Sequence, residues 1–307
     1  MRNAFFNAVF ALAREDERIV LMVGDLGFRI VEGFMAERPK QFLNAGIAEQ
    51  NMMSMAAGMA LEGKIVFAYS IANFPTLRCL EQVRNDVCYH GARVAIFCSG
   101  GGFTYGSMGV THHVTEDLAV TRAMPGLTVI APGDPIEAAC VPAAIIAHDG
   151  PFYVRLGKAG EPNIHAGPID FQRGRAITVR EGDDVSLIAT GSMLLVATRA
   201  ADRLKADGIN ARVLSMHTVK PLDLDAVEAA AAQTGVILTI EEHSIIGGLG
   251  AAVAEYLAER PGAGPRFKRM GVPSAFASEI GSQDHLLAHF GLTEAGVAQT
   301  AKQMLAS

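Results

Sequence analysis

Glu49 is the residue of this chain whose surroundings point most directly to chemistry. It lies in the segment 44–51, in the first turn of a predicted helix that is rich in alanine and methionine. An acidic side chain in a first helical turn can simply complement the helix dipole. Its neighbours in the sequence are mostly apolar or small, however, and they favour a partly desolvated carboxyl group that can exchange protons near neutral pH. Both interpretations stay open on the residues alone.

Phe74 and a pair of histidines could face the same ligand. Phe74 precedes Pro75, a residue suited to a first helical turn. Its ring could stack on a flat ligand or pack as an apolar staple against the helix. A glycine-rich loop, residues 99–110, leads to His112 and His113. Adjacent side chains diverge and no carboxylate or cysteine cluster matches them, so we predict no metal site; His112 suits acid/base or hydrogen-bonding work.

Further polar groups follow other predicted strands. The pair Asp25 and Leu26 comes after the first strand, where the carboxylate is either a site residue or part of ordinary turn chemistry. Arg155 and Lys158 lie beyond a later strand and could hold an anionic substrate group, or could be solvated surface cations. Ligands of doubly wound sheets bind beyond the carboxyl ends of the strands, which is where all these residues fall.

A regular alternation of strands and helices must position these residues. Apolar, strand-like runs recur along the chain, and most are followed by a helix-length segment. They occupy residues 19–23, 64–69, 93–98, 127–131, 152–155, 185–189, 211–216 and 236–240. This alternation predicts an α/β fold whose sheets are mostly parallel and flanked by helices.

The chain is predicted to form two such units. Its 307 residues are enough for two cores, and residues 157–174 carry glycine, proline and asparagine without an apolar period. We therefore expect a first domain over 1–165, a linker over 166–180 and a second domain over 181–307.

Composition excludes several classes of function. The net charge is −6, with 26 Lys+Arg against 32 Asp+Glu and no basic run, so no nucleic-acid partner is expected. With 50% hydrophobic and 19% charged residues the chain has ample material for a core. It has no uninterrupted apolar run of about 18 residues, so no membrane span is expected. Four cysteines without CxxC spacing indicate reduced packing residues of a soluble, cytoplasmic protein.

The N-terminal segment has two interpretations. Residues 4–13 are mostly apolar and follow Arg2, as in a secretory signal peptide. Asn7 interrupts the run, however, and the apolar residues recur at spacings of three and four, which favours the buried face of an amphipathic helix.

Taken in order, these residues resemble the C-terminal half of the transketolase family. That family of thiamine-diphosphate enzymes includes deoxyxylulose-phosphate synthase and the β subunits of 2-oxoacid dehydrogenases. The resemblance covers essentially the whole chain and implies a pyrimidine-binding domain followed by a transketolase C-terminal-like domain. Its motifs are Asp25-Leu26, Gly46-Ile47-Ala48-Glu49-Gln50, Phe74, Thr111-His112, Lys158, Ala189-Thr190-Gly191-Ser192 and Phe290-Gly291-Leu292-Thr293.

The resemblance implies cofactor contacts for five residues. Glu49 matches the catalytic glutamate that contacts N1′ of the cofactor's aminopyrimidine, and Phe74 matches the aromatic residue that stacks on that ring. Asp25 matches an acid near the cofactor, and Leu26 follows it in the same turn. Ile71 stands where the family has a second stacking aromatic.

On the substrate side the resemblance implies contacts for His112 and Lys158, and we expect His113 and Arg155 to contribute beside them. His112 matches a catalytic histidine that hydrogen-bonds substrate oxygens, and His113 lies beside it. Lys158 matches an arginine that holds the sugar phosphate, and Arg155 is a second cation. The implied reaction is transfer of a two-carbon ketol unit from a ketose to an aldehyde, with carbon–carbon chemistry supplied by thiamine diphosphate.

One family motif is missing from the chain. The Gly-Asp-Gly followed some thirty residues later by Asn, which binds the metal and diphosphate in this family, has no counterpart here. The resemblance therefore implies a separate N-terminal, diphosphate-binding subunit that carries Mg²⁺ or Ca²⁺. We predict an α2β2 assembly in which this chain is the β subunit.

Three departures bear on the substrate. Met108 replaces an acid that reads an acceptor hydroxyl, Gly100 stands at about the position of a phosphate-contacting histidine, and Ile71 replaces an aromatic residue. Loss of a hydrogen-bonding partner weakens discrimination for a hydroxyl group. We therefore expect a modified, branched or otherwise unusual sugar.

Two alternatives remain. The chain could belong to a decarboxylating enzyme of the 2-oxoacid dehydrogenase or deoxyxylulose-phosphate synthase kind, in which case pyruvate would release carbon dioxide. It could also be a regulatory subunit that kept the fold without the activity.

Overall fold

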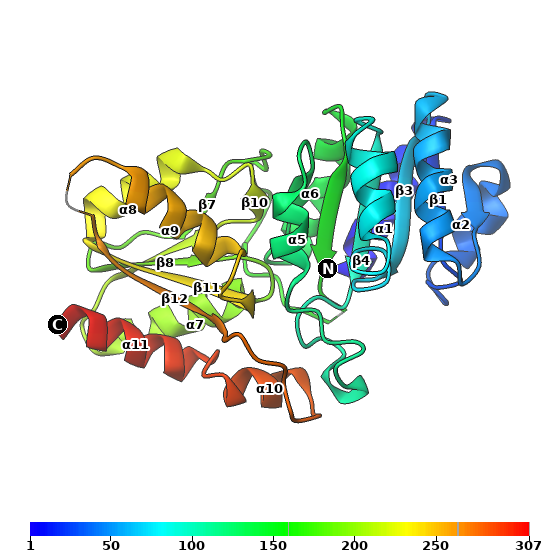
Figure 1. Cartoon of the computed structure of the whole chain (residues 1–307). Coiled ribbons are helices and arrows are strands. Elements are labelled where there is room, and N and C mark those ends of the chain that lie inside the picture. Colours follow the sequence, from blue (N-terminus) through cyan, green and yellow to red (C-terminus); the bar gives the residue numbers. More distant parts are fainter. Residues whose placement is uncertain (159, 263, 307) are drawn as a thin grey trace.

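The first half of the chain builds a sheet whose loops form the candidate site (Figure 1). The computed structural model of the protein describes residues 1–158, 160–262 and 264–306. The strands of this sheet are β1 (Ile19–Val23), β2 (Phe42–Asn44), β3 (Ile65–Ile71), β4 (Val94–Ser99), β5 (Thr128–Ile130), β6 (Phe152–Leu156) and β10 (Thr218–Lys220). Their order is β10-β5-β6-β4-β3-β1-β2, and β10 alone among them runs antiparallel to its neighbour. The carboxyl ends of β1, β3, β4 and β6 therefore meet at one edge.

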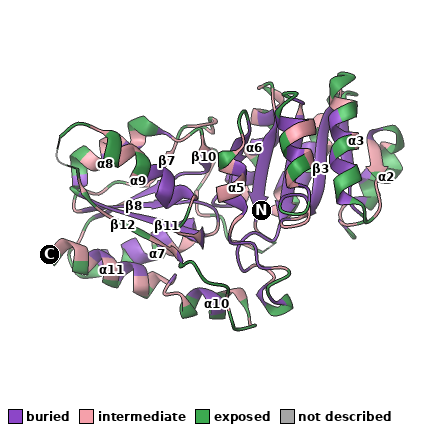
Figure 2. Ribbon diagram, in the orientation of Figure 1, coloured by how far each residue is buried: buried purple, intermediate pink, exposed green. Residues whose placement is uncertain are grey.

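Helices and short turns accompany this sheet and cover both of its faces. They are α1 (Arg2–Glu15), α2 (Glu32–Glu37), η1 (Pro39–Gln41), α3 (Glu49–Leu61), α4 (Leu80–Gln82), the π-helical η2 (Val83–Cys88), η3 (Gly106–Met108), α5 (Asp117–Ala123) and α6 (Pro135–Ile146). Successive residues of β3 alternate between two cores: Val66 packs with α3 and η2, and Phe67 packs with α1 and α6. Because both faces are covered, β1, β4 and β6 are buried along their whole length (Figure 2).

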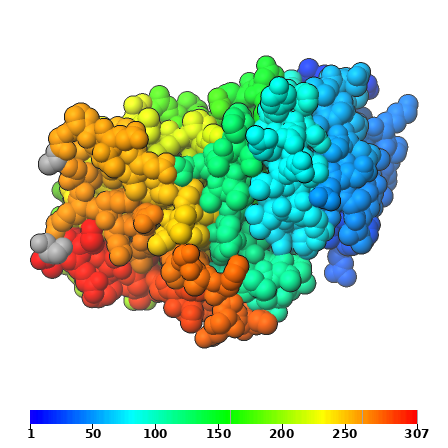
Figure 3. All heavy atoms as spheres, viewed as in Figure 1, coloured from blue at the N-terminus to red at the C-terminus, as the bar shows by residue number. Residues whose placement is uncertain are grey.

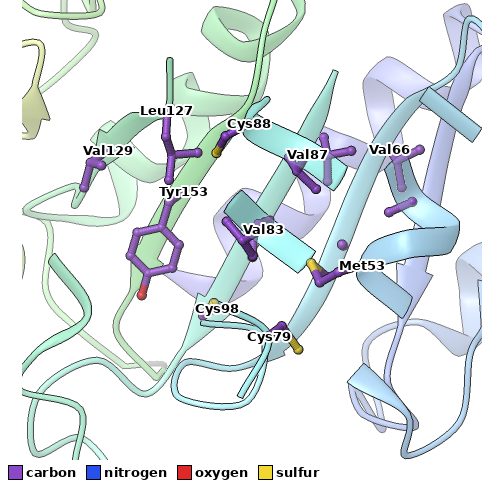
Figure 4. Close-up of a cluster of buried hydrophobic side chains, with 14 of the residues drawn as sticks. Met53, Val66, Cys79, Val83, Val87, Cys88, Cys98, Leu127, Val129 and Tyr153 are labelled. Atoms are coloured by element: carbon purple, nitrogen blue, oxygen red, sulfur yellow. The ribbon is translucent and has the colours of Figure 1, made fainter. Parts of the chain in front are cut away.

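The core beneath α3 and η2 holds three of the four cysteines. Cys79, Cys88 and Cys98 are buried in it, together with Met53 and Tyr153 (Figure 4). All four cysteines are free thiols. Burial raises the pKa of Cys79 to about 12 and that of Cys88 to about 11, so neither thiol forms a reactive thiolate at neutral pH.

The second half builds a smaller sheet of the same kind. Its strands are β7 (Ile177–Arg180), β8 (Val185–Ala189), β9 (Ala211–Ser215), β11 (Val236–Ser244) and β12 (Arg266–Val272), in the order β12-β11-β8-β9-β7. Only the pair β7 and β9 is antiparallel among these strands. Its helices are α7 (Met193–Ala206), α8 (Leu224–Thr234), α9 (Leu249–Glu259), α10 (Gln283–His289) and α11 (Glu294–Ala306). One core packs against α7 and α11, and the other packs against α8 and α9.

The predicted α/β fold with two mostly parallel sheets is confirmed, and each strand-like run coincides with an observed strand. The amphipathic N-terminal helix is also present as α1, which buries Phe5, Phe6 and Val9. The sequence patterns did not indicate β2, β7, β10 or β12. These strands are short or largely exposed, so they lack a continuous apolar run.

The two halves are joined by residues 157–176 and share an edge strand. Residues 157–176 form no helix or strand where the structure describes them, but β7 begins at Ile177, inside the expected linker 166–180. Strand β10, although it lies within 181–307, adds to the edge of the first sheet by pairing Thr218 with Ile130. Figure 3 shows the two halves in close contact, with the residues near 280 against the loop that follows β4.

The connecting segment is held to the first half by two acidic side chains. Asp134 accepts hydrogen bonds from the backbone N–H groups of Ile164 and His165, at 2.8 and 3.0 Å. His165 Nε2 lies 2.8 Å from Glu137 Oε1, and this hydrogen bond is the main cause of a raised pKa of His165.

This contact predicts a pH-dependent contribution to stability. A histidine whose pKa rises on folding stabilises the fold fully below its unfolded pKa of about 6.5, and loses that effect as the pH rises through the folded pKa. His165→Gln is therefore expected to lower the melting temperature at pH 5.5 more than at pH 8.5, as measured by circular dichroism. The exposed His90→Gln serves as the control. An equal loss at both pH values would contradict the assignment.

No helix among the residues that the structure describes is both long and apolar enough to cross a membrane.

Candidate functional site

Glu49 is the first residue of α3 and lies beside the end of β1. Its side chain is only 3% exposed. Gly24, directly after β1, packs closely against it, since a Cβ on Gly24 would lie 3.6 Å from Glu49 Cγ and from Met52 Sδ. The start of α3 and the end of β1 thus hold the carboxyl group at the carboxyl edge of the sheet.

Arg78 joins Glu49 to Phe74. Arg78 Nη1 donates to Glu49 Oε2 at 2.8 Å, and its guanidinium carbon lies 4.4 Å from the centroid of the Phe74 ring. Arg78 is 47% exposed, so the pair is buried at the carboxylate and open to solvent at the cation. The flat guanidinium group of Arg78 therefore contacts both residues. It donates a charged hydrogen bond to Glu49 and lies over the aromatic face of Phe74.

The turn formed by Asp25 and Leu26 is hydrogen-bonded to Asn44, the last residue of β2. Asp25 has a φ of 54°, a left-handed conformation that a non-glycine residue adopts only with local support. Asn44 supplies that support: it accepts from the Asp25 N–H and donates to Asp25 Oδ1, each at 3.0 Å. The Asp25 side chain is exposed at the site edge, whereas Leu26 is half-buried and packs on the core beneath α1.

The two histidines that follow the glycine-rich loop have different surroundings. His112 faces Phe74, with ring centroids 5.6 Å apart at 74°, and Thr111 Oγ1 lies 3.0 Å from its Nδ1. His113 is buried: its Nε2 lies 3.0 Å from the carbonyl oxygen of Gly106, and its ring meets the edge of Phe103. The structure therefore brings His112 to Phe74, and it does not bring His113 there.

The two cations also differ in position, since Arg155 lies inside β6 and only Lys158 follows it. Lys158 is exposed, and its Nζ lies 5.6 Å from the centroid of the Tyr105 ring in the glycine-rich loop. Arg155 is 6% exposed, and its Nε lies 3.0 Å from Asp117 Oδ2. Its Nη2 donates to the carbonyl oxygens of Val114 and Glu242, at 3.0 and 2.7 Å. A guanidinium engaged in this way supports the loop, so a substrate contact by Arg155 stays a sequence prediction.

A buried polar network continues from Arg155 into the second half. Glu242 accepts from the Phe103 N–H at 2.6 Å and from Ser192 Oγ at 2.6 Å, and thereby ties the glycine-rich loop to α7. Beside it, Glu241 accepts from the N–H groups that begin α9, and burial raises its pKa to about 7. Burial lowers the pKa of His243 to about 4. Glu242 and His243 connect the two halves, since His243 Nε2 also accepts from the Ala119 N–H.

The sequence patterns assigned no site role to Arg78, Tyr105 or Asp117. Arg78 follows Phe74 by four residues, a spacing that could have indicated a contact across one turn. Tyr105 is a single aromatic residue in a run of glycines, and its ring presents an aromatic face to Lys158. For Asp117 we find no signal in the sequence.

No group of three or more His, Cys, Asp or Glu side chains among the described residues is arranged to hold a metal ion.

Comparison with known families fits both the fold and the site. Residues 1–160 match the transketolase pyrimidine-binding domain, and residues 174–297 match the transketolase C-terminal domain. Together these matches span most of the chain. The chain therefore belongs to the transketolase family, whose members depend on thiamine diphosphate.

Some of its relatives match it over nearly their whole length and are named as separate subunits. It is 37% identical to one of the subunits of the apulose-4-phosphate transketolase of Phocaeicola vulgatus, covering 99% of this chain and 97% of the relative. It is 38% identical to a subunit of the 6-deoxy-6-sulfo-D-fructose transketolase of a Clostridium species, with coverages of 99% and 94%. A solved split-gene transketolase, described as an inactive β4 tetramer, superposes with a TM-score of 0.89 at 36% identity, covering 99% of this chain and 97% of that chain. This chain corresponds in extent to the C-terminal, or β, subunit of a split transketolase.

The residues at the site fit the pyrimidine end of the family's cofactor. A carboxylate can accept a hydrogen bond from a protonated ring nitrogen, and an aromatic face can stack on the ring. Glu49 and Phe74 already contact one flat N–H donor, the Arg78 guanidinium, at the same time. Their spacing therefore suits a flat nitrogen-containing ring.

Proposed function

We propose that this chain is the β subunit of a thiamine-diphosphate-dependent transketolase that transfers a two-carbon ketol unit from a ketose to an aldehyde. The observation that carries the proposal is the arrangement of Glu49 and Phe74 around a flat N–H donor at the carboxyl edge of the sheet. When bound, thiamine diphosphate supplies the carbon nucleophile for breaking and forming the carbon–carbon bond.

Each site residue then has a defined task. Glu49 would hold the aminopyrimidine and take up or release a proton at its carboxyl oxygen, and Phe74 would stack on the ring. Asp25 and Ile71 lie after β1 and at the end of β3, where they would border the cofactor. The His112 imidazole would hydrogen-bond a substrate oxygen.

Lys158 would bind the anionic end of the substrate. Its ammonium group is exposed, and an exposed cation beyond a strand end can hold a phosphate or a sulfonate oxygen. His113 and Arg155 would act by keeping the glycine-rich loop in place, since both are buried and hydrogen-bonded to backbone carbonyls.

The enzyme would be complete only with a second subunit. No Gly-Asp-Gly with a following Asn occurs in the chain, so the diphosphate and its Mg²⁺ or Ca²⁺ would be bound by a separate N-terminal subunit. Relatives of equal extent are named as subunits, which supports this arrangement. We propose a cytoplasmic α2β2 assembly.

The substrate would be a modified sugar that carries an anionic group. Met108 and Gly100 remove two polar side chains from the glycine-rich loop, which changes the hydrogen-bonding partners of the sugar. The relatives named above act on a 4-phosphate of apulose and on a sulfonated fructose, as their names state. Efficient turnover of xylulose 5-phosphate with ribose 5-phosphate would contradict this part of the proposal.

The proposal is tested by isolating the chain with its partner. A tagged chain is purified gently from its source cells, the co-purifying proteins are identified, and the preparation is assayed with and without thiamine diphosphate and magnesium. The expected result is a stoichiometric partner that carries the missing motif, with cofactor-dependent transfer and no carbon dioxide release.

Other outcomes of that experiment would contradict the proposal. Carbon dioxide from pyruvate would favour a decarboxylating enzyme. Tight cofactor binding and turnover by the chain alone would exclude a split site.

A further inference from the structure

Tyr105 occupies the centre of the glycine-rich loop, at the end of β4. Its ring is half-buried and covers Gly100, which has a φ of +95°. A Cβ at position 100 would lie 2.5 Å from Tyr105 Cδ2 and closer still to Cε2. The Tyr105 ring therefore fills the space that any side chain at position 100 would need.

The Tyr105 hydroxyl ends a chain of three hydroxyl groups. Tyr69 and Ser99 are buried, and their hydroxyl oxygens lie 2.8 Å apart. Ser99 Oγ lies 3.4 Å from the Tyr105 hydroxyl. Either hydroxyl of each pair can be the donor. When Tyr69 donates to Ser99 and Ser99 donates to Tyr105, the proton of the Tyr105 hydroxyl is available to a ligand. Burial raises the pKa of Tyr69, so its end of the chain stays a neutral hydroxyl.

Two residues with proposed substrate contacts flank the same ring. Lys158 Nζ lies 5.6 Å from the ring centroid, within the range of a cation–π contact. The His112 ring meets it nearly at right angles, at 79° and 6.4 Å between centroids. Tyr105 thus lies near both an imidazole and a cation, and it has a hydrogen-bonding group of its own.

We propose that Tyr105 is a specificity-determining residue that contacts the substrate. Its hydroxyl donates to a sugar hydroxyl or to an oxygen of the terminal anion, and its ring places Lys158 to bind that anion. The class of substrate is a sugar whose end carries a phosphate or a sulfonate, two groups with the same charged oxygen chemistry. The inference rests on the proposed transketolase function and adds a residue to it.

The test uses the complex with the partner subunit and three sugars that share one carbon skeleton. Dissociation constants are measured by calorimetry for fructose 6-phosphate, 6-deoxy-6-sulfofructose and fructose, in the unaltered complex and in Tyr105→Phe and Tyr105→Ala variants. Tyr105→Phe is expected to weaken binding of both anionic sugars up to about tenfold, through the lost hydroxyl. Tyr105→Ala is expected to reduce the preference for the anionic sugars over fructose by a further few-fold, because Lys158 loses its aromatic contact.

Controls separate this inference from the proposed function. Tyr89→Phe, at an exposed residue directly after η2, is the matched control and is expected to change nothing. The affinity for thiamine diphosphate, measured on the same complexes, is expected to be unchanged by Tyr105→Phe. Where kinetics are measured, the loss is expected in KM more than in kcat.

The outcomes that overturn the inference are distinct. Equal affinities of all three sugars for the unaltered complex would overturn it, as would Tyr105→Phe and Tyr105→Ala variants that keep the unaltered affinities within twofold. A weaker affinity for thiamine diphosphate in Tyr105→Phe would assign the residue to the cofactor instead. Failure of the unaltered complex to bind the cofactor would overturn the proposed function, and this inference with it.

Discussion

Replacing Glu49 by glutamine is expected to lower kcat of the assembled enzyme on the order of 1000-fold, within the range that acid–base groups contribute. Glutamine keeps the size of the side chain and can still hydrogen-bond, but its amide cannot take up or release a proton near neutral pH. Glu49 is buried, and its ion-pair partner Arg78 cannot give up a proton near neutral pH, so Arg78 cannot take over the proton transfer. Steady-state turnover of the complex measures the effect.

The control for Glu49→Gln is Glu62→Gln. Glu62 follows the last residue of the same helix and is exposed, so its substitution is expected to leave kcat unchanged. Assembly with the partner is checked by size-exclusion chromatography for both variants. A loss smaller than tenfold in an intact, cofactor-loaded Glu49→Gln complex would remove Glu49 from the proposed chemistry.

Asp117→Asn is expected to produce the largest loss of stability, about 3–5 kcal/mol of unfolding free energy. Asp117 is fully buried, and its Oδ2 lies 3.0 Å from Arg155 Nε and 2.6 Å from the Tyr153 hydroxyl. An asparagine keeps the shape and an acceptor for Tyr153 but leaves the Arg155 guanidinium buried without its counter-charge. Chemical denaturation followed by circular dichroism measures the change.

The matched control for this ion pair is Asp149→Asn. Asp149 is 93% exposed and lies 3.5 Å from Arg93, so its substitution is expected to change stability by less than about 1 kcal/mol. Similar losses of unfolding free energy in the two variants would show that the buried ion pair contributes no more to stability than the exposed one. Because Arg155 also holds the carbonyl of Val114, which pairs with Gly102 of the glycine-rich loop, Asp117→Asn is further expected to weaken substrate binding.

Local patterns were enough to predict the buried strands of both sheets. Strands β1, β4 and β6 are buried on both faces, and such strands appear in the sequence as continuous apolar runs. Strand β12 is mostly exposed and β10 has only three residues, so neither leaves such a run. The same reason explains why the patterns did not indicate β7, a short edge strand that is only half-buried.

The sequence by itself determined the two α/β units, the family, and the candidates Glu49, Phe74, His112 and Lys158, because each follows a strand at the carboxyl edge or begins the next helix. Only the tertiary structure showed that His112 faces Phe74 whereas His113 is buried, and that Lys158 is exposed whereas Arg155 is buried. It also brought Arg78 to Glu49 and the Tyr105 ring over Gly100. These distinctions depend on contacts such as that of Glu242 with Phe103, 139 positions away, and on the direction in which each side chain leaves its loop. A linear pattern of residue types contains neither, because periodicity records which face of an element is buried and not which distant group lies against it.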